Sequence, residues 1–592
     1  MMRCACLPPF TMVALSVVVG CGARTSPGDW TGWTGGGASH GTPPADAGRD
    51  GGSDAVTACS PPASSPAPRL VAPLSTSRVT ARRPTLRWAL PSCVAATVDI
   101  CLDRACTRPV GTPAQVTGTR YVPANDLPSG VVYWRVHLAT DTTSTSATWE
   151  LTVGARSASV DSSWGTTLDV NGDGYADLAV GSPELTGSFG GSAYVYLGGA
   201  HGLAGTPAAT LTAPDAGSSW TVFGYSVASA GDVNGDGYSD LVVGATDASG
   251  VRGAAYLYLG GPQGLATTPA VTLADPGGAT GDYFGASVAS AGDLNGDGYA
   301  DVVVATGAGH EVYVYLGGAS GLGATPSTTL TRPGAAPGDG GSASGFGFVL
   351  ASAGDVNGDG YSDLVVGNRD PGGSTGAYVY LGGANGLATT PSSTPALPGF
   401  LGFAYAGDVN GDGYDDVVVQ ATGTPTDGGF ENSDVYLYLG GPQGLVDTPK
   451  AVLSSPGNTE YFGQTVTSAG DVDGDGYADL LVGGYGSGSG NPEAYVYLGG
   501  PDGFAATPSS VAANLGGTYG FGGGVSAGDV NGDGYVDLAV FSSSTEPPGA
   551  PYIISAYLGS AAGVATSPEV TLIDPGGTSD DSFGYSVFGA AN

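Results

Sequence analysis

The sequence predicts an all-β protein: a seven-bladed β-propeller preceded by a small β-sandwich. Glycine accounts for 106 of the 592 residues and charged residues for 12%, which favours turn-rich β structure over helices. Each of seven segments contains four short strand-like runs separated by turn signals, which is the pattern of propeller blades. Each segment also carries one acidic loop, whose first Asp stands at position 169, 232, 293, 355, 408, 471 or 529.

The first residues predict export. Arg3 precedes an apolar run, Phe10 to Val19, that is too short to cross a membrane as a helix. The run leads into VVGC, which resembles a bacterial lipoprotein box with residues 1–20 as the signal peptide and lipid on Cys21. Acyl chains on Cys21 would anchor the chain to the bacterial outer membrane or the cell surface. An ordinary signal peptide that ends near a cysteine is the alternative.

Two segments separate this anchor from the repeats. Residues 21–67 are rich in Gly, Pro, Ser and Thr without apolar periodicity, and they predict a lipid-anchored disordered linker. Residues 68–154 contain strand-like runs such as PTLRWAL and VVYWRVHL. This segment resembles a fibronectin type III sandwich in its size and in Trp88, Tyr133 and Trp134. Another kind of small β-sandwich is the alternative.

Four cysteines follow Cys21 in the chain. An even number in an exported protein predicts two disulfides, for which three pairings are possible. We favour Cys101–Cys106, within CLDRAC, and Cys59–Cys93. A zinc site is the weaker interpretation because no His lies at a metal-ligand spacing from these cysteines.

The acidic loop has the composition of a calcium site. In the second copy, positions 1, 3, 5 and 9 are Asp232, Asn234, Asp236 and Asp240, and Tyr238 at position 7 can offer its backbone carbonyl. Calcium takes six to eight hard oxygen ligands, and the Gly residues at positions 4 and 6 permit a sharp turn. Without a cation, carboxylates held so close would repel one another. The sequence therefore predicts about seven calcium sites.

The predicted ligands occupy positions 1, 3, 5, 7 and 9 of every loop: Asp169, Asn171, Asp173, Tyr175, Asp177, Asp232, Asn234, Asp236, Tyr238, Asp240, Asp293, Asn295, Asp297, Tyr299, Asp301, Asp355, Asn357, Asp359, Tyr361, Asp363, Asp408, Asn410, Asp412, Tyr414, Asp416, Asp471, Asp473, Asp475, Tyr477, Asp479, Asp529, Asn531, Asp533, Tyr535 and Asp537. An EF-hand is excluded, because it needs Glu at position 12 and flanking helices, whereas position 12 is Val in all seven copies. Solvated tight turns are the remaining alternative, but turns do not need Asp at positions 1, 5 and 9.

A Phe-Gly step, the D-x-N-G-D-G-Y-x-D loop and a Val-Gly ending together resemble the FG-GAP repeat of integrin α-subunit propellers and their bacterial relatives. The resemblance extends from residue 160 to residue 592, within a predicted propeller domain of 155–592. It implies that calcium sits in β-hairpin loops on one face of a seven-bladed propeller. The second half of the motif is poor, since VGSP at Val180–Pro183 is its nearest match.

Composition narrows the function classes. A net charge of −36 with a single Lys excludes nucleic acid as a partner. The four histidines, at positions 40, 137, 201 and 310, have no nucleophile or metal partner at a readable spacing, so no enzyme activity is predicted. The prediction is a monomeric, surface-anchored adhesion protein that binds an unknown protein or glycan and contacts the membrane only through its lipid. A propeller-scaffold enzyme acting on polysaccharide or phosphoester and a structural spacer of the envelope are the alternatives.

Variation among the copies predicts where a partner binds. The segments around 182–192, 245–253 and 420–434 differ, whereas the acidic loops are nearly identical. A loop that leaves a strand whose start carries the calcium hairpin emerges on the opposite face, and such loops often carry binding function. Phe430, Glu431 and Arg252 are the predicted anchors. Drift in unselected surface loops is the alternative.

The end of the chain predicts how the ring closes. PEVTLIDPGGTSDDSFGYSVFGAAN matches the segment that leads into the third acidic loop, but the chain stops where the next loop would begin. An open ring would expose strand edges that are prone to pairing. Residues 583–592 are therefore predicted to pack against the first blade.

Overall fold

The computed structural model describes the chain from residue 68 onwards with gaps. The described residues are 68–73, 77–79, 82–90, 95–103, 105–118, 120–139, 141–146, 148–153, 168–185, 190–214, 221–247, 252–278, 282–307, 311–334, 345–369, 376–395, 400–412, 414–422, 433–456, 460–473, 475, 477–485, 493–512, 523–542, 553–576 and 582–588. Every regular element among them is a β-strand. No helix among these residues has the length and apolar character that crossing a membrane requires. The predicted signal peptide, Cys21 and the linker lie outside the described residues.

Residues 68–153 form a β-sandwich of two sheets. The smaller sheet has the strand order β1 (Arg69–Ala72), β3 (Leu86–Ala89), β6 (Arg120–Tyr121). The larger has the order β2 (Ser77–Val79), β9 (Trp149–Val153), β7 (Gly130–Leu138), β4 (Ala95–Cys101), β5 (Ala114–Thr117), and β8 (Asp141–Thr145) also pairs with β7. Trp88, Trp134 and Trp149 are buried in its core. Alternate residues of β7 are buried, as expected of a strand with one face inside. The fibronectin type III assignment stays a prediction.

Seven antiparallel sheets form the rest of the described chain. Each sheet is one blade, and its strands are given from the centre of the ring outwards. The first blade has β36 (Ser586–Phe588), β10 (Leu178–Glu184), β11 (Gly190–Tyr196) and β12 (Ala209–Thr212), and the second has β13 (Thr221–Gly231), β14 (Asp240–Asp247), β15 (Ala254–Tyr258) and β16 (Val271–Ala274). The third has β17 (Phe284–Gly292), β18 (Asp301–Thr306), β19 (Glu311–Tyr315) and β20 (Thr328–Thr331), and the fourth has β21 (Gly345–Gly354), β22 (Asp363–Arg369) and β23 (Gly376–Tyr380). The fifth has β24 (Phe400–Gly407), β25 (Asp416–Thr422), β26 (Ser433–Tyr438) and β27 (Ala451–Leu453), the sixth has β28 (Glu460–Gly470), β29 (Asp479–Tyr485), β30 (Glu493–Tyr497) and β31 (Ser510–Ala512), and the seventh has β32 (Gly523–Gly528), β33 (Asp537–Ser542), β34 (Ile553–Tyr557) and β35 (Val570–Ile573).

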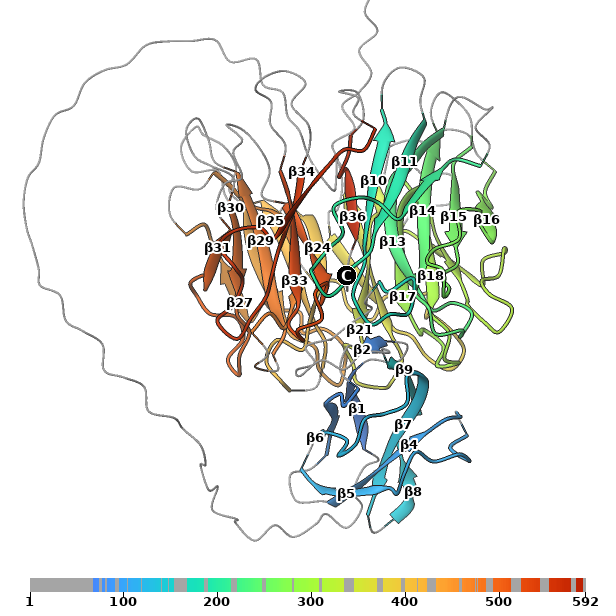
Figure 1. Ribbon diagram of the computed structural model, residues 1–592, viewed down its shortest axis with the longest axis vertical. Helices are drawn as coiled ribbons and strands as arrows, with labels where there is room; N and C mark the ends of the chain where they lie inside the picture. The colour runs from blue at the N-terminus through green and yellow to red at the C-terminus, as the bar shows by residue number, and fades with distance from the viewer. Residues whose placement is uncertain are drawn as a thin grey trace, which may run out of the picture.

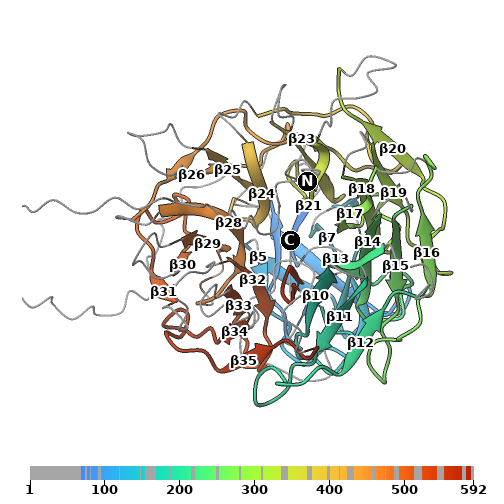
Figure 2. The ribbon, with the colours of Figure 1, turned by 90° about the horizontal axis from the view of Figure 1, so that it is seen from above.

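The sheets follow one another around a common centre, as Figure 2 shows from above. Their innermost strands contact each other in the order β36, β13, β17, β21, β24, β28 and β32, and β32 contacts β36 again. The second strand of a blade is covered on both faces by neighbouring blades. All six residues of β18 are therefore buried, which explains the Val-rich run. The predicted fold class, an all-β seven-bladed propeller, is confirmed.

The fourth blade departs from the predicted four strands. Its sheet has three strands, and its outer edge is reduced to an isolated bridge between Val379 and Ser393. Pro395 occupies the place that Leu330 holds in the strand β20 of the third blade. Proline has no backbone N–H to give to a ladder, so it weakens a strand at this position.

The C-terminal strand completes the first blade. In β36, Ser586, Val587 and Phe588 pair with Gly181, Val180 and Ala179 of β10. Phe583 is fully buried, and its ring centroid lies 5.9 Å from that of Tyr194. The prediction that the chain end packs against the first blade is confirmed, with residues 589–592 outside the described part.

The Phe-Gly step packs its ring within one blade and its glycine against the preceding blade. Phe284 is fully buried, and its ring centroid lies 5.8 Å from that of Tyr313. Gly285 has a φ of +83°, a conformation that residues with a Cβ seldom adopt. A Cβ on Gly244 of the preceding blade would collide with the Gly285 carbonyl. Both glycines therefore serve the close contact between two blades.

The two ends of the ring differ in what surrounds them. The acidic loops join the first and second strands of the blades at the end that faces the sandwich, and the second strands run from there to the far end (Figure 1). Arg252 is exposed and follows the far end of β14. The predicted ligand surface opposite the acidic loops stays a prediction. Phe430 and Glu431 lie outside the described residues.

Candidate metal sites

Each acidic loop curls around the carboxylate of its first Asp. In the second loop, Asp232 Oδ1 accepts hydrogen bonds from the N–H groups of Gly235 at 2.7 Å and of Asp236 at 3.1 Å. Its Oδ2 accepts one from Gly237 N at 2.7 Å. Gly235 and Gly237 have φ values of +74° and +89°, so these two positions need glycine. The sequence pattern thus creates the turn before any cation is considered.

The side chains at positions 3 and 5 continue the turn. Asn234 Oδ1 accepts a hydrogen bond from Asp236 N at 2.9 Å, and Asp236 Oδ1 accepts one from Tyr238 N at 3.1 Å. The Asn234 amide also donates to Asp236 Oδ2 at 2.9 Å. Oxygens from positions 1, 3 and 5 therefore gather on one side of a single turn. This is the convergence that the alternating pattern predicts.

The Asp at position 9 has a second role that the sequence analysis missed. Asp240 is fully buried. Its Oδ2 accepts a hydrogen bond from Val233 N at 3.0 Å, and its Oδ1 accepts one from Gly260 N at 2.9 Å. Gly260 follows the third strand of the blade, so this carboxylate ties the loop to that strand's end. Each oxygen keeps a lone pair for another partner.

The same bond recurs in every blade. Its donors are the glycines two residues after each Tyr-rich strand, which are followed by a second Gly in all copies but the seventh: Gly198, Gly260, Gly317, Gly382, Gly440, Gly499 and Gly559. A Cβ on Gly260 would collide with the carbonyl oxygen of Ser239, so this position requires glycine. The repeated Gly-Gly pair was the signal in the sequence that could have identified this contact.

The loops also bond to one another around the ring. Ser239 N donates to Asp169 O at 3.1 Å, and Ala300 N donates to Asp232 O at 3.1 Å. Ala176 N donates to Asp529 O at 2.9 Å, which links the first loop to the seventh. The acidic loops are therefore part of the contact between blades.

Burial opposes negative charge on the Asp at position 9. It raises the pKa of that carboxyl in every loop, to about 8 for Asp479 and well above the usual range in the others: Asp177, Asp240, Asp301, Asp363, Asp416 and Asp537. The carboxylate at position 1 raises these pKa values further. A buried carboxylate in this position takes up a proton or pairs with a cation at neutral pH.

The sixth loop gathers the most carboxylates. Asp473 replaces the Asn found at position 3 of the other copies. One oxygen each from Asp471, Asp473 and Asp479 lies within 4.8 Å of the other two. Burial and the neighbouring Asp475 raise the pKa of Asp473. Hard, anionic oxygens at this spacing fit a divalent cation such as calcium. The predicted ligands of all seven loops lie among the described residues.

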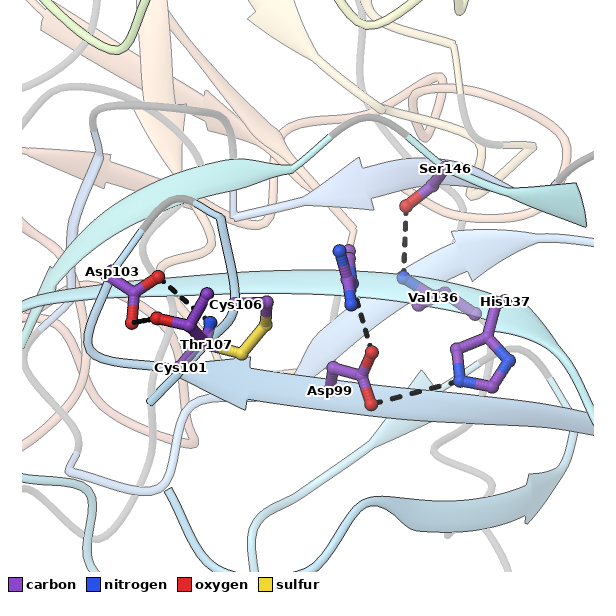
Figure 3. Close-up of a disulfide and its surroundings, with 9 residues drawn as sticks. Asp99, Cys101, Asp103, Cys106, Thr107, Val136, His137 and Ser146 are labelled. Carbon is purple, nitrogen blue, oxygen red and sulfur yellow. Dashed lines mark hydrogen bonds and ion pairs between the residues drawn. A yellow bond between two sulfur atoms is a disulfide. The ribbon is translucent and has the colours of Figure 1, made fainter. Parts of the chain in front are cut away.

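The sandwich holds the other predicted site residues. Cys101 and Cys106 form a disulfide, the pairing favoured from the sequence (Figure 3). Cys59 and Cys93 lie outside the described residues. Asp103 in the enclosed turn accepts hydrogen bonds from Thr107 N at 2.9 Å and Thr107 Oγ1 at 3.1 Å.

His137 also has a partner that the sequence did not indicate. Asp99 on the neighbouring strand β4 lies 3.8 Å from His137 Nε2 and 3.0 Å from Arg135 Nε (Figure 3). The pairing of β4 with β7 brings these side chains together, and spacing along the chain could not show it. His201 is exposed on a turn, and His40 and His310 lie outside the described residues.

Comparison with known proteins identifies the repeats. The FG-GAP-like repeat family matches residues 232–304, 293–366, 355–419 and 471–540, and the FG-GAP repeat family matches residues 163–196. Mouse integrin alpha-IIb is 42% identical over 160 residues, which cover 24% of this chain and 14% of the integrin. Human integrin alpha-7 is 37% identical over 152 residues, which cover 24% of this chain and 12% of the integrin. The matched part is therefore a small fraction of these relatives.

Solved structures show weaker likeness. A Lactobacillus plantarum protein has a TM-score of 0.41 at 13% identity, covering 71% of this chain and 100% of that chain. The exotype rhamnogalacturonan lyase YesX has a TM-score of 0.35 at 12% identity, covering 86% of this chain and 84% of that chain. Scores this low support no transfer of activity.

Proposed function

We propose, from the premise that this chain is an FG-GAP repeat protein with integrin-α-like repeats, that it is an exported, calcium-binding protein of the adhesion type. Calcium would be held in the seven acidic loops by the residues at positions 1, 3, 5, 7 and 9. The opposite face of the propeller would contact a protein or glycan partner. Bound calcium would supply positive charge that neutralises the buried carboxylates.

The arrangement of the acidic loops carries this proposal. Each loop gathers carboxylates that burial disfavours as free anions, and the hydrogen bonds of the loop leave acceptor sites free on several of these carboxylates. The loops also bond from blade to blade. Calcium bound there would strengthen the ring as a rigid scaffold, which is what a binding surface built from loops requires.

Calcium binding is tested by counting ions and by melting. Equilibrium dialysis of the purified chain should give about seven calcium ions per molecule. Ligand linkage adds about 3–4 kcal/mol per site at a hundred- to thousandfold excess over Kd, so EDTA should lower the melting temperature of the propeller strongly. An unchanged melting temperature in EDTA would disprove this part of the proposal.

The partner surface is tested by exchanging a loop. A glycan array and an envelope pull-down, each with and without calcium, would first identify a partner. Replacing residues 420–434 by the shorter segment 245–253 should then abolish partner binding while calcium-dependent melting stays intact. If binding survives this exchange but is lost when the acidic loops are blocked, the partner occupies the other face.

Anchoring to a membrane is a separate part of the proposal. Lipid on Cys21 would hold the chain at the outer membrane or cell surface, with residues 21–67 as a spacer. Cys21→Ser should release the protein from the membrane fraction into the soluble fraction. Labelling with radioactive palmitate should be lost in the same variant, and labelling that persists would exclude Cys21 as the lipid site.

A further inference from the structure

The fourth acidic loop, residues 355–363, has a partner from outside the propeller. The indole Nε1–H of Trp149 donates a hydrogen bond to the backbone carbonyl of Gly360 at 3.2 Å. Trp149 belongs to β9 of the sandwich, and Gly360 is position 6 of the loop. Figure 1 shows β9 close to the end of β21, where this loop begins. The bond therefore connects the two domains directly at an acidic loop.

On the sandwich side, the donor is held firmly. Trp149 is 3% exposed and packs edge-on against Trp134, with ring centroids 6.0 Å apart and planes at 84°. The two tryptophans are also paired across β7 and β9. Because this packing fixes the indole, the hydrogen bond between Trp149 and Gly360 forms only when the loop places the Gly360 carbonyl within reach of the indole N–H.

On the propeller side, the same loop is supported by an Asp of the next blade, a residue type that no other copy has at this position. Asp415 of the fifth blade accepts a hydrogen bond from Asp355 N at 2.7 Å through Oδ2. The hydroxyl of Tyr405 donates to Asp415 Oδ1 at 3.1 Å, and both side chains are buried. At the position of Asp415 the other copies have Ala, Ser or Val: Ala176, Ser239, Ala300, Ser362, Ala478 and Val536. The first residue of the fourth loop is thus fixed by the next blade.

Gly360 lies inside the part of the loop that a cation would order. Its N–H donates to Asp355 Oδ2 at 2.9 Å, and the next N–H, of Tyr361, donates to Asp359 Oδ1 at 3.1 Å. Asp355, Asp359 and Tyr361 are three of the proposed calcium ligands. A cation that draws these oxygens together would also fix the Gly360 carbonyl that faces Trp149.

We propose that the fourth acidic loop is a cation-dependent clamp that fixes the sandwich against the propeller through Trp149. This inference rests on the proposed calcium binding. With the cation bound, the loop presents the Gly360 carbonyl to the indole. Without it, repulsion between the carboxylates loosens the loop, and the sandwich is released. One hydrogen bond of this kind shifts the equilibrium between docked and released domains about 2- to 12-fold.

The test compares two loops in the full-length chain. Asp359→Ala removes a proposed ligand from the fourth loop, and Asp297→Ala removes the equivalent ligand from the third loop. The side chains of Asp359 and Asp297 are both exposed, so the two substitutions are matched. Domain docking is measured as the rate of tryptic cleavage at Arg156, between the domains, and as the radius of gyration from small-angle X-ray scattering. In calcium, Asp359→Ala should speed cleavage about 2- to 12-fold and enlarge the particle. Asp297→Ala should weaken calcium binding at the third loop to a similar degree but leave the cleavage rate at Arg156 and the radius of gyration unchanged.

A second variant separates the clamp from the metal. Trp149→Phe keeps an aromatic ring against Trp134 but removes the N–H donor. It should bind as many calcium ions as the unaltered chain, yet its cleavage rate at Arg156 should no longer depend on calcium. Equal behaviour of the two loop variants, or calcium-dependent protection that persists in Trp149→Phe, would overturn the clamp. Failure of the unaltered chain to bind calcium would instead overturn the proposed function.

Discussion

The closure of the ring by its last strand can be tested at a single buried side chain. Phe583 precedes β36, is fully buried and packs against Tyr194 of the first blade. The backbone on either side of it is bound to β10, since Ser582 N donates to Pro183 O at 3.3 Å and Gly584 N donates to Gly181 O at 2.9 Å. Phe583→Ala removes the ring while these backbone bonds can still form.

The size of the effect follows from burial. Replacing a buried Phe by Ala costs about 3–5 kcal/mol of stability. The propeller has roughly 440 residues, so its entropy of unfolding is about 0.9 kcal/mol per kelvin near the melting temperature. Phe583→Ala should therefore lower the melting temperature of the propeller by about 3–5 °C, and deletion of residues 583–592 should lower it further.

Calorimetry in saturating calcium measures this shift, and an exposed apolar residue in the neighbouring blade supplies the control. Ile573 is 59% exposed on β35, so Ile573→Ala should change stability by no more than about 0.5 kcal/mol. Size-exclusion chromatography would show whether the altered ring pairs with a second molecule through its exposed strand. If the chain without residues 583–592 melts like the unaltered chain and stays monomeric, β36 does not hold the ring closed.

Three further predictions concern the loops and the contacts between blades. Burial raises the folded-state pKa of carboxyls such as Asp240 and Asp479, the latter to about 8. The folded state therefore holds protons that the unfolded state loses near pH 4, and the stability of the calcium-free protein should fall as the pH rises from about 4 to about 8. Calorimetry in EDTA should give a higher melting temperature at pH 5 than at pH 8, and saturating calcium should abolish that order. Asp473→Asn gives the sixth loop the same ligand side chains as the other loops. Isothermal titration calorimetry should then show that the calcium affinity of one site falls on the order of tenfold. Gly244→Ala places a Cβ against the Gly285 carbonyl, and chemical denaturation should show a loss of about 1–3 kcal/mol.

Features set by short-range pattern could be predicted from the sequence. The acidic loops follow from alternating oxygens and glycines within nine residues, and the turn of Asp232 over Gly235 and Gly237 needs no other part of the chain. The blades follow from the recurrence of that pattern together with the Val-rich and Tyr-rich runs. The partial match of Ser586–Phe588 to an inner strand likewise predicted where the chain end would pack.

Contacts between distant segments could not be predicted in this way. The bond from Gly260 to Asp240 requires that the end of the third strand lie beside the loop, which only the folded sheet establishes. Trp149 and Gly360 are 211 residues apart, and their contact depends on how two domains dock. Asp415 was visible as an unusual residue among the copies. Its partner Asp355, however, is 60 residues away in another blade.

The ring is closed at two places, and both bear on why the acidic loops are uniform while other loops vary. At the acidic end, the first loop bonds to the seventh through Ala176 N and Asp529 O, in the same way as the other neighbours for which such bonds are described. The chain end adds a separate closure at β10, which lies within the body of the first blade. A change in an acidic loop alters both its own turn and its bond to the next blade. Among the described residues, Arg252 beyond the far end of β14 forms neither a bond between acidic loops nor a bond to the chain end, so its segment can vary without opening the ring.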